Sequence, residues 1–391
     1  MRRLIVLLCL LVGVSSFAGD MFSYGFYLRL RQEYFDNAFD FNDDSTIFND
    51  DNYFRIKASV WGKWNFTDNI SLFTKLTSEP KIAIESDGKL ANNRDTWDEE
   101  IFFDNLYLDM NFGVVNFRLG RQDFLMTHGE GFVIMDGTPY DGSRSYYFNA
   151  VKTTFKIGEN NSVDFIYVDD PAKDEYLPVI DWQDRNVVKT DEDGIIVYGK
   201  FKIPENLSLE PYYIYKFEDS TPNLTLNTIG NRIVLNLSPW QIRGELAYQY
   251  GEYKGGNNRE AWGGQAYIKR TFKEAKLSPS FELGYAIERG EPAYWTNLHL
   301  YRAKLDMNLT QKTGLSLAYN YLMADESREG VAPFFGDGNE RGHLGHIILT
   351  HKFNQNIDGH LHFEYFKPGD FYAEANRDDA IFLRWQLQMK F

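Results

Sequence analysis

Hydrophobic and polar residues alternate one by one along many short segments of this chain. In residues 380–391 every second residue from Ile381 to Phe391 is apolar, and the residues between them include Arg384 and Lys390. A period of two is that of a β-strand with one apolar face, and no helix produces it. The same alternation returns in residues 22–33, 53–60, 241–250, 277–288 and 357–365. The pattern therefore predicts an all-β protein.

Applied to the whole chain, the pattern predicts eighteen strands. They begin near residues 22, 53, 70, 101, 114, 148, 162, 194, 207, 224, 241, 261, 277, 298, 315, 342, 357 and 380. Short turns such as 67–69 and 354–356 alternate with long connections such as 77–100 and 125–147. Transmembrane β-barrels have this rhythm, with short turns at one end and longer loops at the other. We predict a transmembrane antiparallel β-barrel of about 18 strands, with both termini in the periplasm.

The first residues have the features of an export signal. Arg2 and Arg3 precede the apolar run Leu4–Val14, and Ser16-Phe17-Ala18 forms a cleavage site with small residues. The apolar run is too short to span a bilayer, which requires about 20 residues. We therefore divide the chain into a signal peptide, residues 1–18, and an outer-membrane β-barrel domain, residues 19–391.

Composition narrows the classes of protein. The net charge of −15 argues against nucleic acid as a partner, because phosphate binding requires clustered cations. The single cysteine, Cys9, lies within the predicted signal and excludes a disulfide scaffold or a cysteine nucleophile from the mature protein. A terminal aromatic such as Phe391 resembles the assembly signal of bacterial outer-membrane barrels. Outer-membrane lipid and the barrel assembly machinery are thus expected partners.

Charged residues on the inward phase of the strands are mostly basic. Those that we select as pore-lining are Arg29, Arg31, Arg55, Lys57, Lys75, Arg118, Arg232 and Arg243. The first six belong to neighbouring predicted strands and form one basic arc of the wall. In a narrow passage such an arc raises the local concentration of anions. Alternatively, these charges form ion pairs that stabilise a polar wall.

No catalytic motif is present. The sequence contains neither Gly-x-Ser-x-Gly nor His-Glu-x-x-His. His128 neighbours Glu130 in a connection that we expect to fold inward, where it would pack the loop or narrow the pore. His346, His360 and His362 share an inward phase and could form a weak metal site. We expect no enzyme activity.

Acidic residues gather in the long connections. Two runs could bind Ca²⁺ through carboxylate oxygens: Asp40, Asp43 and Asp44, and Asp191, Glu192 and Asp193. Neither run matches a known calcium-binding loop, and solvated loop surface is the more common role of such runs. No other cofactor is expected.

The segment Arg118-Leu119-Gly120-Arg121-Gln122-Asp123-Phe124, followed by Asp136-Gly137 and Arg144, resembles the alginate export family of outer-membrane barrels. The resemblance implies an eighteen-stranded channel with an arginine-rich constriction for an acidic polysaccharide. It adds Arg121 and Arg144 to the pore-lining residues. Strict alternation places Arg121 outward, unless a bulge at Gly120 shifts the phase.

The expected function is passive, anion-preferring passage of an acidic polysaccharide or oligosaccharide across the outer membrane. The turn Asn354-Gln355-Asn356 is too short for the periplasmic plug of the family's alginate exporter, so smaller anionic saccharides or other anions fit as well. A periplasmic export or uptake partner is compatible with this function. The alternatives are a general or small-anion porin, an outer-membrane hydrolase, and a structural or adhesive barrel.

Overall fold

The computed structural model describes residues 21–45, 50–85, 100–124, 127–130, 132–133, 148–182, 186–203, 206–289, 297–329, 332 and 334–391. The predicted signal peptide, residues 1–18, lies outside the described residues, as does Arg144. Within the described part of the chain, no helix is long and apolar enough to cross a membrane.

The described residues form nineteen strand segments and one short 3₁₀ helix. In chain order they are β1 (Phe22–Asp36), β2 (Asp51–Thr67), β3 (Ile70–Ser78), β4 (Lys81–Glu85), β5 (Phe102–Phe112), β6 (Val115–Gln122), β7 (Phe148–Ile157), β8 (Asn161–Asp170), β9 (Glu192–Lys202), β10 (Leu207–Glu218), β11 (Leu224–Leu237), β12 (Trp240–Tyr253), β13 (Asn258–Thr271), β14 (Ser280–Arg289), β15 (Leu298–Asn308), β16 (Thr313–Met323), β17 (Glu340–Lys352), β18 (Ile357–Pro368), η1 (Glu374–Asn376) and β19 (Ala380–Lys390).

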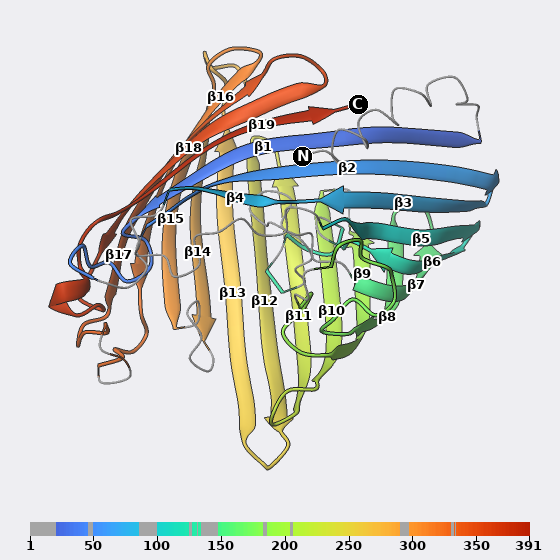
Figure 1. The fold of residues 1–391 in the computed structure, drawn as a ribbon, viewed down its shortest axis with the longest axis horizontal. Coiled ribbons are helices and arrows are strands. Elements are labelled where there is room, and N and C mark those ends of the chain that lie inside the picture. The colour runs from blue at the N-terminus through green and yellow to red at the C-terminus, as the bar shows by residue number, and fades with distance from the viewer. Residues whose placement is uncertain are drawn as a thin grey trace.

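The strands form one closed antiparallel sheet. β1 pairs with β2 on one side and with β19 on the other, from Tyr27 opposite Lys390 to Asp36 opposite Ile381. In Figure 1 the near wall, β1 to β3, crosses the far wall, β10 to β13, as tilted strands of a barrel do. Closure removes the exposed strand edges that would otherwise require partners.

The barrel has eighteen strand positions because β3 and β4 occupy one position. Both pair with β2, and Pro80, which has no backbone N–H, separates them. The carbonyl of Pro80 still accepts a hydrogen bond from Ile56 N at 3.1 Å, which keeps the wall continuous. The predicted antiparallel barrel and its strand number are thus confirmed, and the placement of both termini in the periplasm stays a prediction.

The predicted strand starts agree with the structure to within three residues, and one late start has a clear backbone cause. The strand expected near residue 277 begins at Ser280, because Leu277 and Ser278 have φ angles of 70° and 40° and form a left-handed turn. Leu277 continues the apolar alternation of the strand, so periodicity alone assigns it to the strand. Such φ values are incompatible with an extended strand.

The two faces of the wall have different side chains. Tyr213, Ile229, Tyr248 and Trp262 lie opposite one another along β10 to β13, and all are exposed large hydrophobic residues. Such a row forms the lipid-facing surface of a membrane barrel. Phe391 belongs to this face: it exchanges two backbone hydrogen bonds with Phe26 and its residue is 63% exposed.

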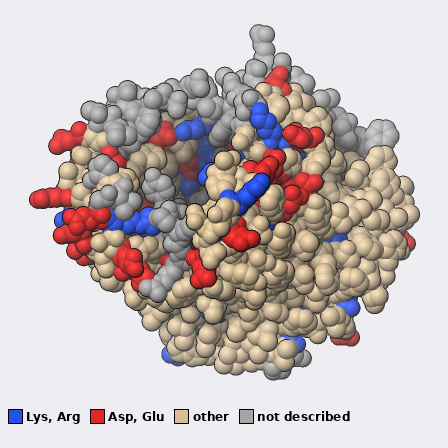
Figure 2. Space-filling model, turned by 90° about the horizontal axis from the view of Figure 1, so that it is seen from below, with Lys and Arg blue, Asp and Glu red and all other residues tan. Residues whose placement is uncertain are grey.

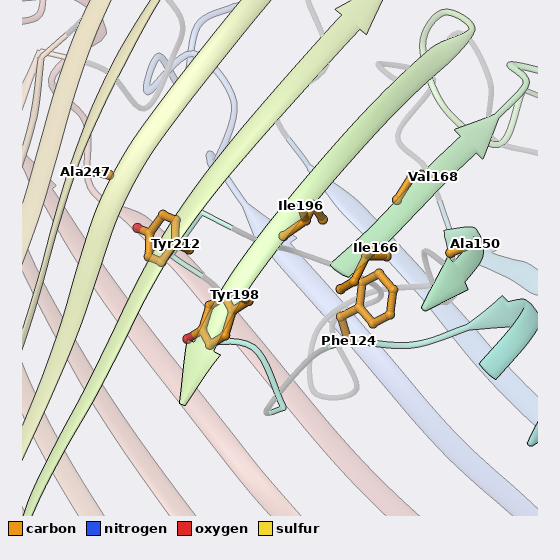
Figure 3. Close-up of a cluster of buried hydrophobic side chains, with 8 residues drawn as sticks. All are labelled: Phe124, Ala150, Ile166, Val168, Ile196, Tyr198, Tyr212 and Ala247. Atoms are coloured by element: carbon orange, nitrogen blue, oxygen red, sulfur yellow. The ribbon is translucent and has the colours of Figure 1, made fainter. Parts of the chain in front are cut away.

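A hydrophobic core lies inside the barrel, where the connection after β6 folds inward. Ile166 and Ile196 are buried although their sequence neighbours Phe165 and Ile195 are exposed, so both lie on the inner face. Phe124, just after β6, is fully buried against this face. Figure 3 shows the eight buried residues of the core: Phe124, Ala150, Ile166, Val168, Ile196, Tyr198, Tyr212 and Ala247.

Candidate pore wall

The inward-folded segment around residues 124–133 is held by polar contacts with three strands. His128 Nε2 lies 2.8 Å from Asp164 on β8, and the hydroxyl of Thr127 lies 2.9 Å from His128 Nδ1. Burial lowers the pKa of His128, and the hydrogen bond with Asp164 opposes that shift. A largely neutral His128 at pH 7 therefore donates its Nε2 proton to Asp164. As predicted, His128 packs the loop.

Glu130 connects this segment to strands β11 and β12. Its carboxylate binds Arg232 on β11 and lies 3.7 Å from Arg243 on β12. Arg232 also binds Glu210 at 2.7 Å, and Arg243 binds Glu282 at 3.0 Å. Two of the predicted pore-lining arginines thus hold a loop carboxylate within the lumen.

The members of the basic arc on β1 and β2 lie on the inner face of the wall and are nearly closed to solvent. Arg29 and Arg31 are 1% and 0% exposed, and each lies opposite another cation, Lys57 and Arg55 respectively. Like charges that face each other destabilise a sheet unless counter-charges lie between them. Glu33 and Glu79 supply these counter-charges.

Four cations of the arc, together with Arg384 on β19, converge on these two carboxylates. Glu79 binds Arg29 at 2.5 Å and lies 3.6 Å from Lys57. Glu33 accepts contacts from Arg31, Arg55 and Arg384 at 3.3, 3.3 and 2.6 Å. The charges of this cluster are therefore paired, and five cations share two carboxylates; attraction of anions by the arc stays a prediction.

Farther around the wall, Lys75 and Arg118 also have acidic partners. Lys75 Nζ lies 2.7 Å from Asp104, and Arg118 makes a two-pronged contact with Asp109 at 2.6 and 2.9 Å. The guanidinium of Arg118 lies 4.0 Å from the centre of the Tyr107 ring, which is a cation–π contact. Both cations remain partly exposed to the lumen.

Arg121 is buried, although strict alternation would place it in lipid. Gly120 has a φ of 118°, and a Cβ atom there would lie 2.3 Å from the Leu106 carbonyl oxygen, so only glycine fits. The ladder with β5 nevertheless keeps its register across Gly120, so the expected bulge is a local twist without a register shift. Arg121 binds Asp174, in the β8–β9 connection, at 2.7 and 2.9 Å. Its contact with substrate remains a prediction.

Three stacked aromatic residues on the inner wall were not identified as site residues from the sequence. Trp61, Phe73 and Tyr107 lie on β2, β3 and β5, with ring centres 6.0 and 5.0 Å apart and interplanar angles of 22° and 21°. Trp61 lies directly opposite Lys75, so it shares the inner face. In the sequence, such a residue can be recognised as an aromatic residue among the polar residues of the inward phase, as Trp61 is between Ser59 and Lys63.

A cavity of about 330 Å³ lies beside this aromatic stack. Lys63, Arg118 and Lys152 contribute to its lining, together with Asp109 and the short turn after β2. Figure 2 shows a hollow face of the molecule with Lys and Arg side chains inside and Asp and Glu side chains around its edge. An anion that passes the acidic rim would meet cations along the inner wall.

The acidic loop residues make contacts within the protein. Asp191 accepts a hydrogen bond from Ala172 N, Glu192 binds Lys216, and Asp193 accepts one from the Tyr167 hydroxyl. In the other run, Asp43 N donates to Asp378, and burial together with the nearby Asp378 carboxylate raises the pKa of Asp43. Calcium binding by either run remains a prediction.

A closed antiparallel barrel with an apolar exterior and a charged, partly open interior defines an outer-membrane channel. The profile of the alginate export family, described as "Alginate export", matches residues 20–315, and the chain belongs to this family. The expected resemblance is thereby confirmed, as is the location in the bacterial outer membrane.

Solved outer-membrane porins share this fold. OccAB1 of Acinetobacter baumannii is 12% identical over 97% of this chain and 98% of its own, with a TM-score of 0.68. A BenF-like porin of Pseudomonas fluorescens Pf-5 is 10% identical over 95% and 99%, with a TM-score of 0.64. OccK5 (OpdH) of Pseudomonas aeruginosa is 10% identical over 94% and 98%, with a TM-score of 0.61. No curated protein sequence matches the chain.

Proposed function

We propose that this barrel is a passive, anion-preferring channel for acidic oligosaccharides or polysaccharides. The observation that carries the proposal is that cations and stacked aromatic rings share one stretch of inner wall. Trp61, Phe73 and Tyr107 form the stack, and Lys63 and Arg118 line the cavity beside it.

Each part of this wall suits one part of an acidic sugar. Aromatic faces offer flat apolar surface to the C–H face of a sugar ring. Arg and Lys replace part of the water around its carboxylates, and Arg118 is fixed in orientation by Asp109. Because several weak contacts lie side by side, a bound chain can move from one to the next without being trapped.

A small-anion porin is the second candidate, and the cationic wall favours it. Such a channel would use the cations and leave the aromatic stack without a role. Replacing an aromatic residue therefore separates the two functions, because chloride passage does not depend on it.

The test compares Trp61→Ala with Trp64→Ala in planar bilayers. Trp64 is on the same strand but belongs to the outer face, where it is 51% exposed, and so provides a matched control. We expect a short oligouronate to block current in the parent and in Trp64→Ala. In Trp61→Ala the binding constant should fall about tenfold, which corresponds to ~1.4 kcal/mol. A neutral oligosaccharide of equal length should bind more weakly than the oligouronate.

Ion preference is measured in the same bilayers. We expect chloride to pass in preference to potassium at low salt, and the preference to shrink as salt rises, because the Debye length falls from ~30 Å at 0.01 M to ~3 Å at 1 M. Chloride preference without oligouronate block would favour the small-anion porin. Cation preference in the parent would overturn the anion proposal altogether.

A further inference from the structure

Two histidines and a glutamate meet on the inner wall far from the basic arc in sequence. His346 on β17 lies directly opposite Glu364 on β18, and His362 is two residues before Glu364 on the same face. One ligand atom from each residue lies within 4.8 Å of the other two. This is the one group of three metal-ligating side chains that the described part of the chain brings together.

The two imidazoles approach one carboxylate oxygen. Glu364 Oε1 lies 3.1 Å from His346 Nδ1 and 2.9 Å from His362 Nε2. The His362 Nε2 atom is buried, and among the described residues it has no partner in hydrogen-bond geometry despite this short distance. This nitrogen therefore lies close to the carboxylate without a hydrogen bond that satisfies it.

These observations lead us to propose that His346, His362 and Glu364 bind a divalent transition-metal ion such as Zn²⁺. Imidazole nitrogen and carboxylate oxygen are preferred zinc ligands, at about 2.0–2.2 Å from the metal. Ligand atoms in a tetrahedral zinc site lie roughly 3.3 Å apart, close to the two distances measured to Glu364 Oε1. Water from the lumen completes the coordination.

The surroundings hold the site and limit its strength. The ring of Phe382 packs edge-on against His362 with centroids 5.5 Å apart, which restricts the imidazole. Arg384 lies opposite His362 on β19, and its charge opposes a cation at the site. Glu33 reduces that opposition by binding Arg384 at 2.6 Å. His360 is two residues before His362 on β18, and the ring centres of these two histidines lie 6.5 Å apart.

The experiment titrates the folded, tag-free barrel with ZnCl₂ against a chromophoric chelator. We expect one zinc ion per chain, and His346→Asn, His362→Asn and Glu364→Gln should each weaken binding at least about tenfold. His351→Asn serves as the matched control, because His351 is also on β17 but contacts Thr313. Each variant is first checked for a folded barrel by its heat-modifiable mobility.

Two further readouts strengthen the test. Co²⁺ in place of Zn²⁺ should give the visible absorption of a histidine-containing site in the parent, and the absorption should be lost in His362→Asn. Acidification should also weaken binding, because a metal ligand must be deprotonated and metal binding releases protons. Absence of zinc binding by the parent, or equal binding by parent and Glu364→Gln, overturns the proposal.

Discussion

On β1 and β2, Arg29, Arg31 and Arg55 bind carboxylates close to their own strands, whereas on β11 and β12, Arg232 and Arg243 bind a loop carboxylate, Glu130. Side chains of the first group are 0–12% exposed and those of the second 14–27%. All five lie on the inward phase and were predicted to line the pore. The strand phase of a charged residue thus gives the face on which it lies, while its partner determines whether it joins strands of the wall or holds the inward segment.

The difference also separates the expected energies. Removing one partner of a buried ion pair costs about 3–5 kcal/mol, because the remaining charge is left buried and uncompensated. Fully exposed pairs contribute only about 0–1 kcal/mol, and the Glu130 contacts, with that side chain 30% exposed, are closer to this limit than the contacts of Glu33. The basic arc should therefore affect barrel stability, and the Glu130 contacts should affect the lumen with little effect on the wall.

Glu33→Gln should have the largest effect. The change leaves Arg31, Arg55 and Arg384 around a neutral side chain, and we expect a loss of about 3–5 kcal/mol in unfolding free energy. Urea unfolding of the barrel in lipid vesicles measures it. Glu252→Gln, at an exposed position near the end of β12, should leave the transition unchanged. Equal stability of Glu33→Gln and the parent would mean that the arc is no structural element.

Glu130→Ala should have an intermediate effect. Losing the contacts with Arg232 and Arg243 weakens the docking of the inward segment by about 1 kcal/mol, while the barrel keeps its stability. Single-channel recordings should show larger conductance or more frequent fluctuations than the parent. Glu159→Ala, in the exposed β7–β8 turn, is the control. A lowered urea midpoint without a conductance change would reverse the assignment of the two regions.

Acidification should have the smallest effect. The pKa of His128 is lowered in the docked segment, so the undocked segment binds a proton more readily. Docking is then fully stable above pH ~6.5 and weakens as pH falls, by at most ~1.4 kcal/mol per pH unit. Current fluctuations should rise between pH 7.5 and 5.5 in the parent. His128→Gln cannot titrate and should show no such rise; a rise in both proteins would assign the effect to other groups.

Most of the fold follows from alternation, because lipid outside and a polar lumen inside impose opposite requirements on successive residues. The alternation does not predict strand boundaries that are set by backbone conformation rather than by side-chain polarity. Leu277 has the polarity of a strand residue, yet its φ of 70° places it in a turn. Pro80 can be recognised in the sequence as a break in a strand. The sequence does not show that β3 and β4 share one position of the barrel, because this follows from their common pairing with β2.

The site was predictable only in part. Phase identified the arginines, but the convergence of Arg31 and Arg384 on Glu33 depends on the closure between β1 and β19, which no local pattern encodes. The contact of Arg121 with Asp174 likewise depends on where a long connection folds. The role of Trp61 could not be predicted from its residue type, because an aromatic residue suits a lipid-facing position as well as a sugar-facing one.

The hairpin between β12 and β13 extends beyond the other connections in the lower part of Figure 1. At its tip, Gly255 and Gly256 have φ angles of 125° and 95°, and a Cβ atom at either position would meet nothing within 4 Å. This tip therefore has room for a bulky substituent such as a dye or an epitope. With both termini in the periplasm, as the sequence predicts, a probe there would report on the surface of intact cells while the channel continued to conduct.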